Sequence, residues 1–155
     1  WIRIKVFMIL HRITTKPYIN DLSGTGAMLY GGRWNKKGKR MLYTSGSLSL
    51  AALEIIANLS SSKLKNLYCV ELDFPDQLKI ETIESLPKHW NLFPHERGSV
   101  ELGSNFIQKG GLCLKVPSAL IPTEFNYLLN PLHDDFNQIR VTDSRPLMID
   151  QRLVK

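Results

Sequence analysis

Alternation of apolar and polar residues is clearest in the middle of the chain. Every even-numbered residue from Tyr68 to Phe74 is apolar, whereas Glu71 and Asp73 fall on the opposite side, so residues 67–74 are predicted to form a half-buried strand. Shorter apolar runs, ended by proline or by turn residues, predict further strands. They cover residues 6–13, 41–45, 112–116, 125–129 and 139–142.

Two longer stretches favour helices. Ser47 can cap a helix that runs from Leu48 to about Leu59 and is ended by three serines. Residues 100–109 predict a second helix, closed by Gly110 and Gly111. A helical turn is expected at residues 133–137, with turns and loops at residues 20–26 and 87–98. Short strands with two or three helices between them, and no internal repeat, predict a single α+β domain.

The start of the chain is expected to lie outside that domain. Residues 1–7 precede Met8, which resembles a translation start, and they lack the apolar run and the cleavage site of a secretory signal. Residues 1–7 are therefore interpreted as an upstream extension, and residues 8–155 as the domain.

Composition narrows the class of protein only a little. The chain of 155 residues carries a formal net charge of +6, which suits a polyanion, a small phosphorylated ligand or an acidic protein partner. Cys69 and Cys113 sit between apolar neighbours and are interpreted as reduced core thiols, which favours a cytoplasmic location. The sequence has no close pair of His or Cys ligands, so it does not indicate a metal site. It also has no stretch that is apolar enough to span a bilayer.

Glu54 is the most informative residue for chemistry. It is the only charged residue between Met41 and Ser62, and apolar residues lie on both sides of its predicted helix. That helix is expected to be buried nearly all round. Because an unpaired buried charge costs several kcal/mol, the carboxylate needs a partner, and a structural ion pair and an active site explain it equally well.

Arg33 is the expected partner of Glu54. It follows two glycines, and its guanidinium group matches a pyrophosphate or a carboxylate. Taken alone, a turn with a surface arginine is the simpler explanation, just as Tyr43 alone is best explained as a core aromatic residue and Ser118 as the start of a turn. Ser45 lies near the predicted helix N-terminus, where amides and hydroxyls can hold an anion.

Taken together, these segments resemble the RES domain, a family of bacterial toxins paired with Xre-type antitoxins. The resemblance covers roughly residues 10–142. The motif-bearing segments are His11–Ile13, Gly31–Asn35, Gly38, Tyr43–Ser45, Leu50–Glu54, Val116–Ala119 and Asn126–His133. The arginine, glutamate and serine for which the family is named fall on Arg33, Glu54 and Ser118. The proline that usually follows the last histidine is replaced by Asp134.

The resemblance implies a fold similar to the ADP-ribosyltransferases, with small mixed or antiparallel sheets and a cleft between them. NAD is expected to bind there as a substrate, with no true cofactor. Its nicotinamide–ribose bond would be broken by hydrolysis, phosphorolysis or ADP-ribosyl transfer. An Xre-type antitoxin is expected to cover the cleft of a toxin that dimerises within the complex. Neither a membrane nor a nucleic acid is expected as a partner.

Roles for the matching residues follow from this chemistry. Glu54 would bind a ribose hydroxyl and offset the positive charge of the transition state. Arg33, helped by Arg12, would hold the pyrophosphate or the ribose, and the Tyr43 ring would stack on nicotinamide. Arg33, Tyr43 and Glu54 are thus the predicted catalytic residues. The predicted binding residues are Arg12, Gly32, Trp34, Asn35, Ser45, Ser118 and Asn126.

Two other functions fit parts of the sequence. The net charge, with His11 and His133 as an acid–base pair, would suit a toxin that cleaves RNA, although no aromatic residues interleave with the basic run of residues 36–40. A binding module without catalytic activity would explain Arg33 and Glu54 as a buried structural pair.

Overall fold

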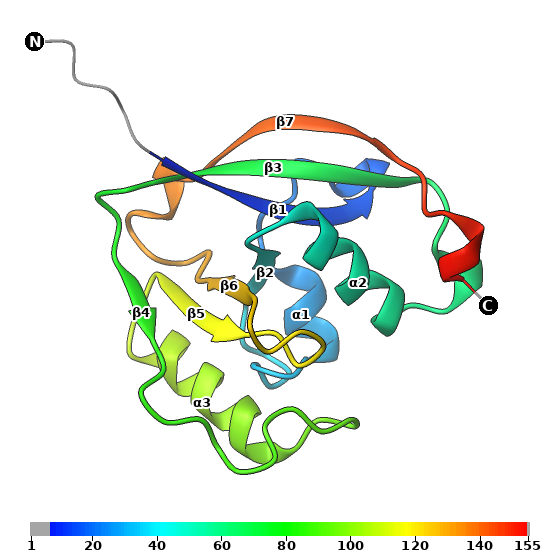
Figure 1. Cartoon of the computed structure of the whole chain (residues 1–155). Coiled ribbons are helices and arrows are strands. Elements are labelled where there is room, and N and C mark those ends of the chain that lie inside the picture. The colour runs from blue at the N-terminus through cyan, green and yellow to red at the C-terminus, as the bar shows by residue number, and fades with distance from the viewer. Residues whose placement is uncertain (1–6, 155) are drawn as a thin grey trace, which may run out of the picture.

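The computed structural model describes residues 7–154, which form seven strands, three α-helices and four short 3-10 helices (Figure 1). The strands are β1 (Phe7–Thr15), β2 (Leu42–Ser45), β3 (Leu67–Pro75), β4 (Ile80–Thr82), β5 (Cys113–Pro117), β6 (Phe125–Leu129) and β7 (Arg140–Leu147). The helices are α1 (Thr25–Tyr30), α2 (Leu48–Asn58) and α3 (Arg97–Gln108). The 3-10 helices are η1 (Lys16–Tyr18), η2 (Ser61–Lys63), η3 (Phe136–Gln138) and η4 (Gln151–Leu153).

The seven strands form one mixed sheet in the order β4-β5-β6-β2-β1-β3-β7, in which only β4 and β5 are parallel. β1 pairs with β3 along its whole length, from Phe7 opposite Pro75 to Thr15 opposite Leu67. Its pairing with β2 is limited to His11 opposite Ser45. The predicted α+β domain is confirmed, and the small sheets expected for it are two halves of a single sheet, joined by this one residue pair.

Two apolar cores hold the halves in place. One spans both halves and includes Leu10 and Leu72 from β1 and β3 together with Leu42 and Leu129 from β2 and β6. The other packs α3 against the second half of the sheet and includes Trp34 and Phe106. Each such buried side chain contributes about 1.5–3 kcal/mol relative to an exposed one. The predicted reduced core thiols are confirmed, because Cys69 in β3 and Cys113 in β5 are both buried and unpaired.

α2 lies against β1 and β2 and carries Glu54. The predicted cap is confirmed, since the Ser47 hydroxyl accepts a hydrogen bond from the Leu50 amide at 3.1 Å. The expectation that this helix is buried nearly all round is wrong. Only Leu50 and Ala51 are buried, and Leu53 on the other side is 38% exposed. An apolar sequence alone cannot show that one face of the helix is left uncovered by the rest of the domain.

Several element boundaries differ from the predicted ones. The sequence pattern missed α1, which begins within the expected turn, and the three-residue strand β4. β7 extends to Leu147 because it follows the long strand β3 beyond the predicted end. Of the expected extension, residues 1–6 lie outside the described residues, and Phe7 is the first residue of β1. Among residues 7–154, no helix combines the length and the hydropathy that a membrane crossing requires.

Candidate active site

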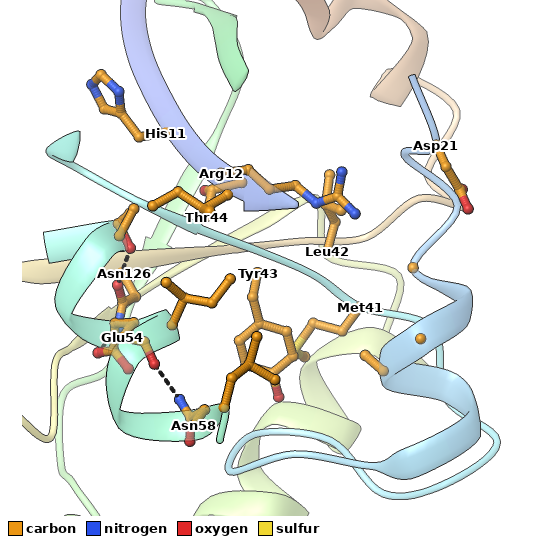
Figure 2. A pocket seen from close by; sticks show the side chains of 18 of the residues that line it. His11, Arg12, Asp21, Met41, Leu42, Tyr43, Thr44, Glu54, Asn58 and Asn126 are labelled. Carbon is orange, nitrogen blue, oxygen red and sulfur yellow. Dashed lines mark hydrogen bonds between the residues drawn. The ribbon is translucent and has the colours of Figure 1, made fainter. Parts of the chain in front are cut away.

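A cleft of about 360 Å³ opens where β1 and β2 diverge beyond their single residue pair. Residues 11–13 of β1 line one side and residues 41–45, leading into and forming β2, line the other. The ends of the cleft are formed by residues 24–27 around the start of α1 and by the inner face of α2. Figure 2 shows Tyr43 between α1 and α2, with Arg12 reaching from β1 toward Asp21. The gap in the sheet is thus a hollow with charged and aromatic walls.

Glu54 lines this cleft and is held by two hydrogen bonds to one carboxylate oxygen. Its Oε1 accepts a hydrogen bond from the Ser118 hydroxyl and another from the Asn126 amide, both at 2.8 Å. Its Oε2 accepts no hydrogen bond from any residue within 7–154. The side chain is therefore fixed through one oxygen, while the other is free to accept a hydrogen bond from a ligand.

The two donors are themselves fixed. The Ser118 hydroxyl accepts hydrogen bonds from the amides of Leu120 and Ile121, and Ser118 is 0% exposed. The side-chain oxygen of Asn126, Oδ1, accepts a hydrogen bond from the Ser45 hydroxyl at 2.7 Å. A chain of hydrogen bonds thus runs from Ser45 through Asn126 to Glu54. Connected bonds of this kind hold a side chain more firmly than isolated ones. Ser118 acts on Glu54 and has no surface of its own for a ligand.

Arg33 is not the direct partner of Glu54, so that prediction is wrong. No ion pair within 4.0 Å joins them among the described residues. One guanidinium nitrogen, Nη1, instead donates to the backbone carbonyls of Trp90 and Leu92, both at 2.8 Å. Burial lowers the pKa of Arg33, and the charge of Glu54 partly opposes that shift, so the two groups are close enough to interact through space. Arg33 fixes the segment predicted as the 87–98 loop, whose last two residues begin α3. The sequence could not reveal this because both acceptors are backbone groups.

Arg12 is the cationic side chain that lines the cleft. Its Nη1 donates to the Tyr18 carbonyl at 3.1 Å, which leaves its other N–H groups available. Burial lowers the pKa of Arg12, and the nearby Asp21 carboxylate opposes that shift. The predicted binding residue Arg12 therefore occupies the position in which an anionic ligand would meet it.

Tyr43 lines the cleft with its ring, while its hydroxyl is buried. The hydroxyl donates to the Asn35 carbonyl oxygen at 2.6 Å and accepts from the Trp34 amide at 3.1 Å. Burial raises the pKa of this phenol well above its ordinary value. A Cβ added to Gly32 would lie 2.7 Å from the same hydroxyl oxygen, so only glycine leaves room for it. Tyr43 can therefore offer a ligand its ring, but not an exchangeable proton.

Trp34 and Asn35 lie beneath the cleft. They are 3% and 1% exposed and do not line it. Trp34 packs in the core beside Trp90, with 6.1 Å between the ring centroids. Asn35 uses its whole amide in contacts within the protein. Gly32 likewise does not line the cleft. The geometry therefore gives these three residues no direct contact with a ligand. They support the residues that line the cleft.

The histidines considered for RNA cleavage are not brought together. His11 lines the cleft, whereas His133 lines a different hollow beside α3, where its Nδ1 accepts a hydrogen bond from the Asp135 amide. Asn58 and Asp21 are among the polar lining residues that the sequence interpretation missed. Asn58 lies one helical turn after Glu54, which is a signal that helical spacing offers. Asp21 comes from a turn-rich segment and carries no such signal.

A protein of known structure shares this fold. The solved structure of the M. tuberculosis MbcT–MbcA toxin–antitoxin complex contains a similar chain, with a TM-score of 0.74 and 19% identity over 93% of this chain and 86% of that one. This likeness shows that the two chains share one class of fold, which in the solved structure belongs to a chain of a toxin–antitoxin complex.

Sequence comparison places the chain more narrowly. The model of the RES domain matches residues 9–150, and the chain belongs to this family. "Toxin Res" of Photorhabdus laumondii is 39% identical over 153 residues, covering 96% of this chain and 98% of that protein. The "Prs ADP-ribosylating toxin" of a Sphingobium species is 37% identical over 142 residues, covering 88% of each. The resemblance inferred from the sequence motifs is confirmed.

Proposed function

We propose that this protein is the toxin of a toxin–antitoxin pair and that it depletes NAD by breaking the nicotinamide–ribose bond. The observation that carries the proposal is the state of Glu54 in the cleft, with one oxygen held by Ser118 and Asn126 and the other free. Its RES-family relatives are named as toxins, and one of them as an ADP-ribosylating toxin, which supports a reaction at the same bond of NAD.

The bond breaks with its electron pair moving to the nicotinamide ring nitrogen. Nicotinamide then leaves as a neutral molecule, so no strong general acid is required. Positive charge builds up on the ribose, and an acceptor forms the new bond to the same carbon. Glu54 Oε2 accepts a hydrogen bond from a ribose hydroxyl and offsets that charge. Fixed groups aimed at developing charge typically contribute about 10²–10³ in kcat.

Two other cleft residues position the substrate. Arg12, with most of its N–H groups free, binds the pyrophosphate through charge-assisted hydrogen bonds. The ring of Tyr43 stacks on nicotinamide. The ring is the part of Tyr43 that a ligand can contact, because the hydroxyl is held by Trp34 and Asn35. Arg33 supports the cleft from the side through the 87–98 loop, and its charge acts on the site through space.

The charge of the cleft favours water as the acceptor. Arg12 is the only Lys or Arg among the described residues that line it, and Asp21 and Glu54 oppose it. The pyrophosphate of NAD would pair with Arg12, and the Arg33 side chain that acts through space already donates to two backbone carbonyls, so a phosphate ion would meet little free counter-charge. A neutral acceptor avoids this repulsion. ADP-ribosyl transfer to a protein is the second candidate, supported by the relative named for that activity.

An antitoxin is the proposed protein partner. The solved structure with the similar fold is a toxin–antitoxin complex. The net charge of +6 would attract an acidic partner surface. We expect an Xre-type antitoxin to cover the cleft and the toxin to form a dimer in that complex.

The decisive experiment incubates the purified protein with NAD, with and without inorganic phosphate, and identifies the products by mass. We expect nicotinamide and ADP-ribose in both cases. A phosphorylated ADP-ribose that increases with phosphate concentration would overturn the choice of water, and labelling of an added protein would favour ADP-ribosyl transfer.

Glu54→Gln tests the role of the carboxylate, because glutamine keeps the shape and removes the charge. NAD loss should fall by about 10²–10³ while the circular dichroism spectrum is unchanged. Glu101→Gln is the matched control, because Glu101 forms an exposed ion pair with Arg97 on α3. RNA loss without NAD loss would favour an RNA-cleaving toxin, and a folded wild-type protein that consumes neither would favour a binding module.

A further inference from the structure

Asn35 is a buried residue whose side chain connects two walls of the cleft. Its Nδ2 donates to the carbonyl of Ala27 in α1 at 2.8 Å and to that of Lys39 at 3.1 Å, with a longer contact to Lys36 at 3.3 Å. Its Oδ1 accepts the proton of the Tyr43 hydroxyl at 2.6 Å. One amide therefore joins α1, the loop that follows it, and β2.

The contacts engage both polar atoms of the amide. An asparagine side chain has two N–H donors and one carbonyl acceptor, and all of them are satisfied within the protein at a residue that is 1% exposed. The backbone of Asn35 adds to this connection, because its carbonyl accepts a hydrogen bond from the Gly32 amide at 2.9 Å. Asn35 thus has no group left for a ligand, although its partners Tyr43 and Ala27 both line the cleft.

We propose that Asn35 is a positioning residue, which sets the place of the Tyr43 ring relative to α1 and so the width of the cleft at its substrate-stacking wall. This inference rests on the proposed function, since it assigns Tyr43 the task of stacking on the substrate. The hydroxyl of Tyr43 is held between Asn35 and the Trp34 amide. Without the Asn35 acceptor, its proton has no partner in a buried site, and the ring shifts toward the cleft to find water.

Removing this contact is expected to change the geometry of the cleft as well as the stability of the domain. A displacement of about 1 Å from a residue outside the chemistry can cost about 10²-fold in rate. Asn35→Ala should therefore lower kcat/KM for NAD by about 10²-fold. Asn35→Asp keeps an acceptor for Tyr43 but turns a carboxylate toward the Ala27 and Lys39 carbonyls, so it should preserve the ring contact and disturb α1.

The test is a double-mutant cycle on kcat and KM, measured well below each variant's melting temperature. It compares wild type, Asn35→Ala, Tyr43→Phe and the double variant. If Asn35 acts through the Tyr43 hydroxyl, its removal costs little once that hydroxyl is absent, so the double variant loses little more than Tyr43→Phe alone. Losses that multiply would overturn the proposal, as would wild-type kcat/KM in folded Asn35→Ala. If Asn35→Ala does not fold, Asn35→Ser replaces it in the cycle.

Asn130→Ala is the matched control. Asn130 is also a buried asparagine, 4% exposed, and its amide bridges Gly111 and Leu132 away from the cleft. It should lose stability and keep kcat/KM within about threefold, since its partners do not line the site. A similar loss of kcat/KM in Asn130→Ala would show that any buried asparagine has the same effect, which contradicts a specific role for Asn35.

A crystal structure of the Asn35 variant separates this inference from the proposed function. A displaced Tyr43 ring supports the positioning role even if the wild-type protein consumes no NAD, in which case the proposed function fails on its own. A ring in its original place overturns the positioning role, whatever the activity of the wild-type protein.

Discussion

The Ser118 hydroxyl donates a hydrogen bond to the Glu54 carboxylate over 2.8 Å, from a position with no solvent exposure. The same hydroxyl oxygen accepts the amides of two residues in the following turn. Ser118 therefore connects the loop after β5 to α2, and it can influence a substrate only through the carboxylate that it orients.

Ser118→Ala should separate this orienting role from a general loss of fold. Glu54 keeps Asn126 as its one remaining donor, so we expect NAD turnover to fall about tenfold, as for a loss of about 1.4 kcal/mol in the transition state. The free energy of unfolding should fall by about 1–3 kcal/mol, because the amides of Leu120 and Ile121 lose their acceptor. Steady-state kinetics and urea denaturation measure the two effects.

Ser99→Ala provides the comparison for that experiment. Ser99 is equally buried, but its hydroxyl donates to the Glu96 carbonyl at the start of α3, away from the cleft. Its variant should lose stability and retain turnover. Undiminished turnover in folded Ser118→Ala would remove Ser118 from the support of Glu54.

Arg33→Lys tests whether this arginine supports a loop. Lysine keeps the charge, but it replaces the planar guanidinium group, whose Nη1 donates to both the Trp90 and the Leu92 carbonyl, with a compact ammonium group on a flexible stem. We expect the 87–98 segment to be cleaved faster in limited proteolysis, with a loss of stability of about 1–3 kcal/mol. By contrast, Arg12→Lys should raise KM for NAD without changing the proteolysis pattern. Equal protease resistance of Arg33→Lys and wild type would contradict the loop role.

Helix α3 offers a prediction in which two effects have opposite signs. Replacing a helical glycine by alanine normally stabilises a helix by about 1 kcal/mol. At Gly103, however, a Cβ would lie 1.8 Å from the Trp34 carbonyl oxygen, which is backbone and cannot move aside cheaply. Gly103→Ala should therefore lower the melting temperature, and the clash should also displace the loop that carries Arg33. A melting temperature at or above the wild-type value would show that α3 can shift away.

His11 predicts how stability depends on pH. Burial lowers its pKa below the ordinary value of 6.5, Glu71 opposes that shift, and Arg145 adds to it. Its Nδ1 is buried without a hydrogen-bond partner among the described residues. The unfolded chain therefore takes up the proton more readily than the folded one, so stability is full above about pH 6.5 and falls as the pH decreases further.

The His11→Gln variant measures that contribution. Its melting temperature should decline less than that of the wild type between about pH 7 and pH 5. Part of the decline should remain, because burial also lowers the pKa of His95. Parallel melting curves for the two proteins across this range would exclude His11 as a source of the pH dependence.

The sequence predicted the local elements better than the contacts that build the site. Alternation identified the strand at residues 67–74, and Ser47 identified the start of α2, because each depends on neighbouring residues. Glu54 was identified as a functional candidate because a charge is unusual in an apolar helix. Its true partners, Ser118 and Asn126, are more than sixty residues away and come from a turn and from β6, so no local pattern could pair them with it.

The roles of the glycine-rich motif show the same limit. The sequence indicated that Arg33, Trp34 and Asn35 matter together, but it could not say which of them faces a ligand. Packing decides that question. Trp34 and Asn35 are buried against α3 and β2, while Arg33 turns to the 87–98 loop.

Because His11 opposite Ser45 is the single residue pair between β1 and β2, one edge of the central strand β1 is largely unpaired. Beyond that pair, β1 stays bonded to β3, yet its backbone groups on the other side face the hollow instead of β2. In amide exchange, the interior of this sheet should therefore contain a few positions that behave like a free edge, next to fully protected neighbours. The domain carries in its centre the kind of unpaired border that proteins usually keep at their periphery.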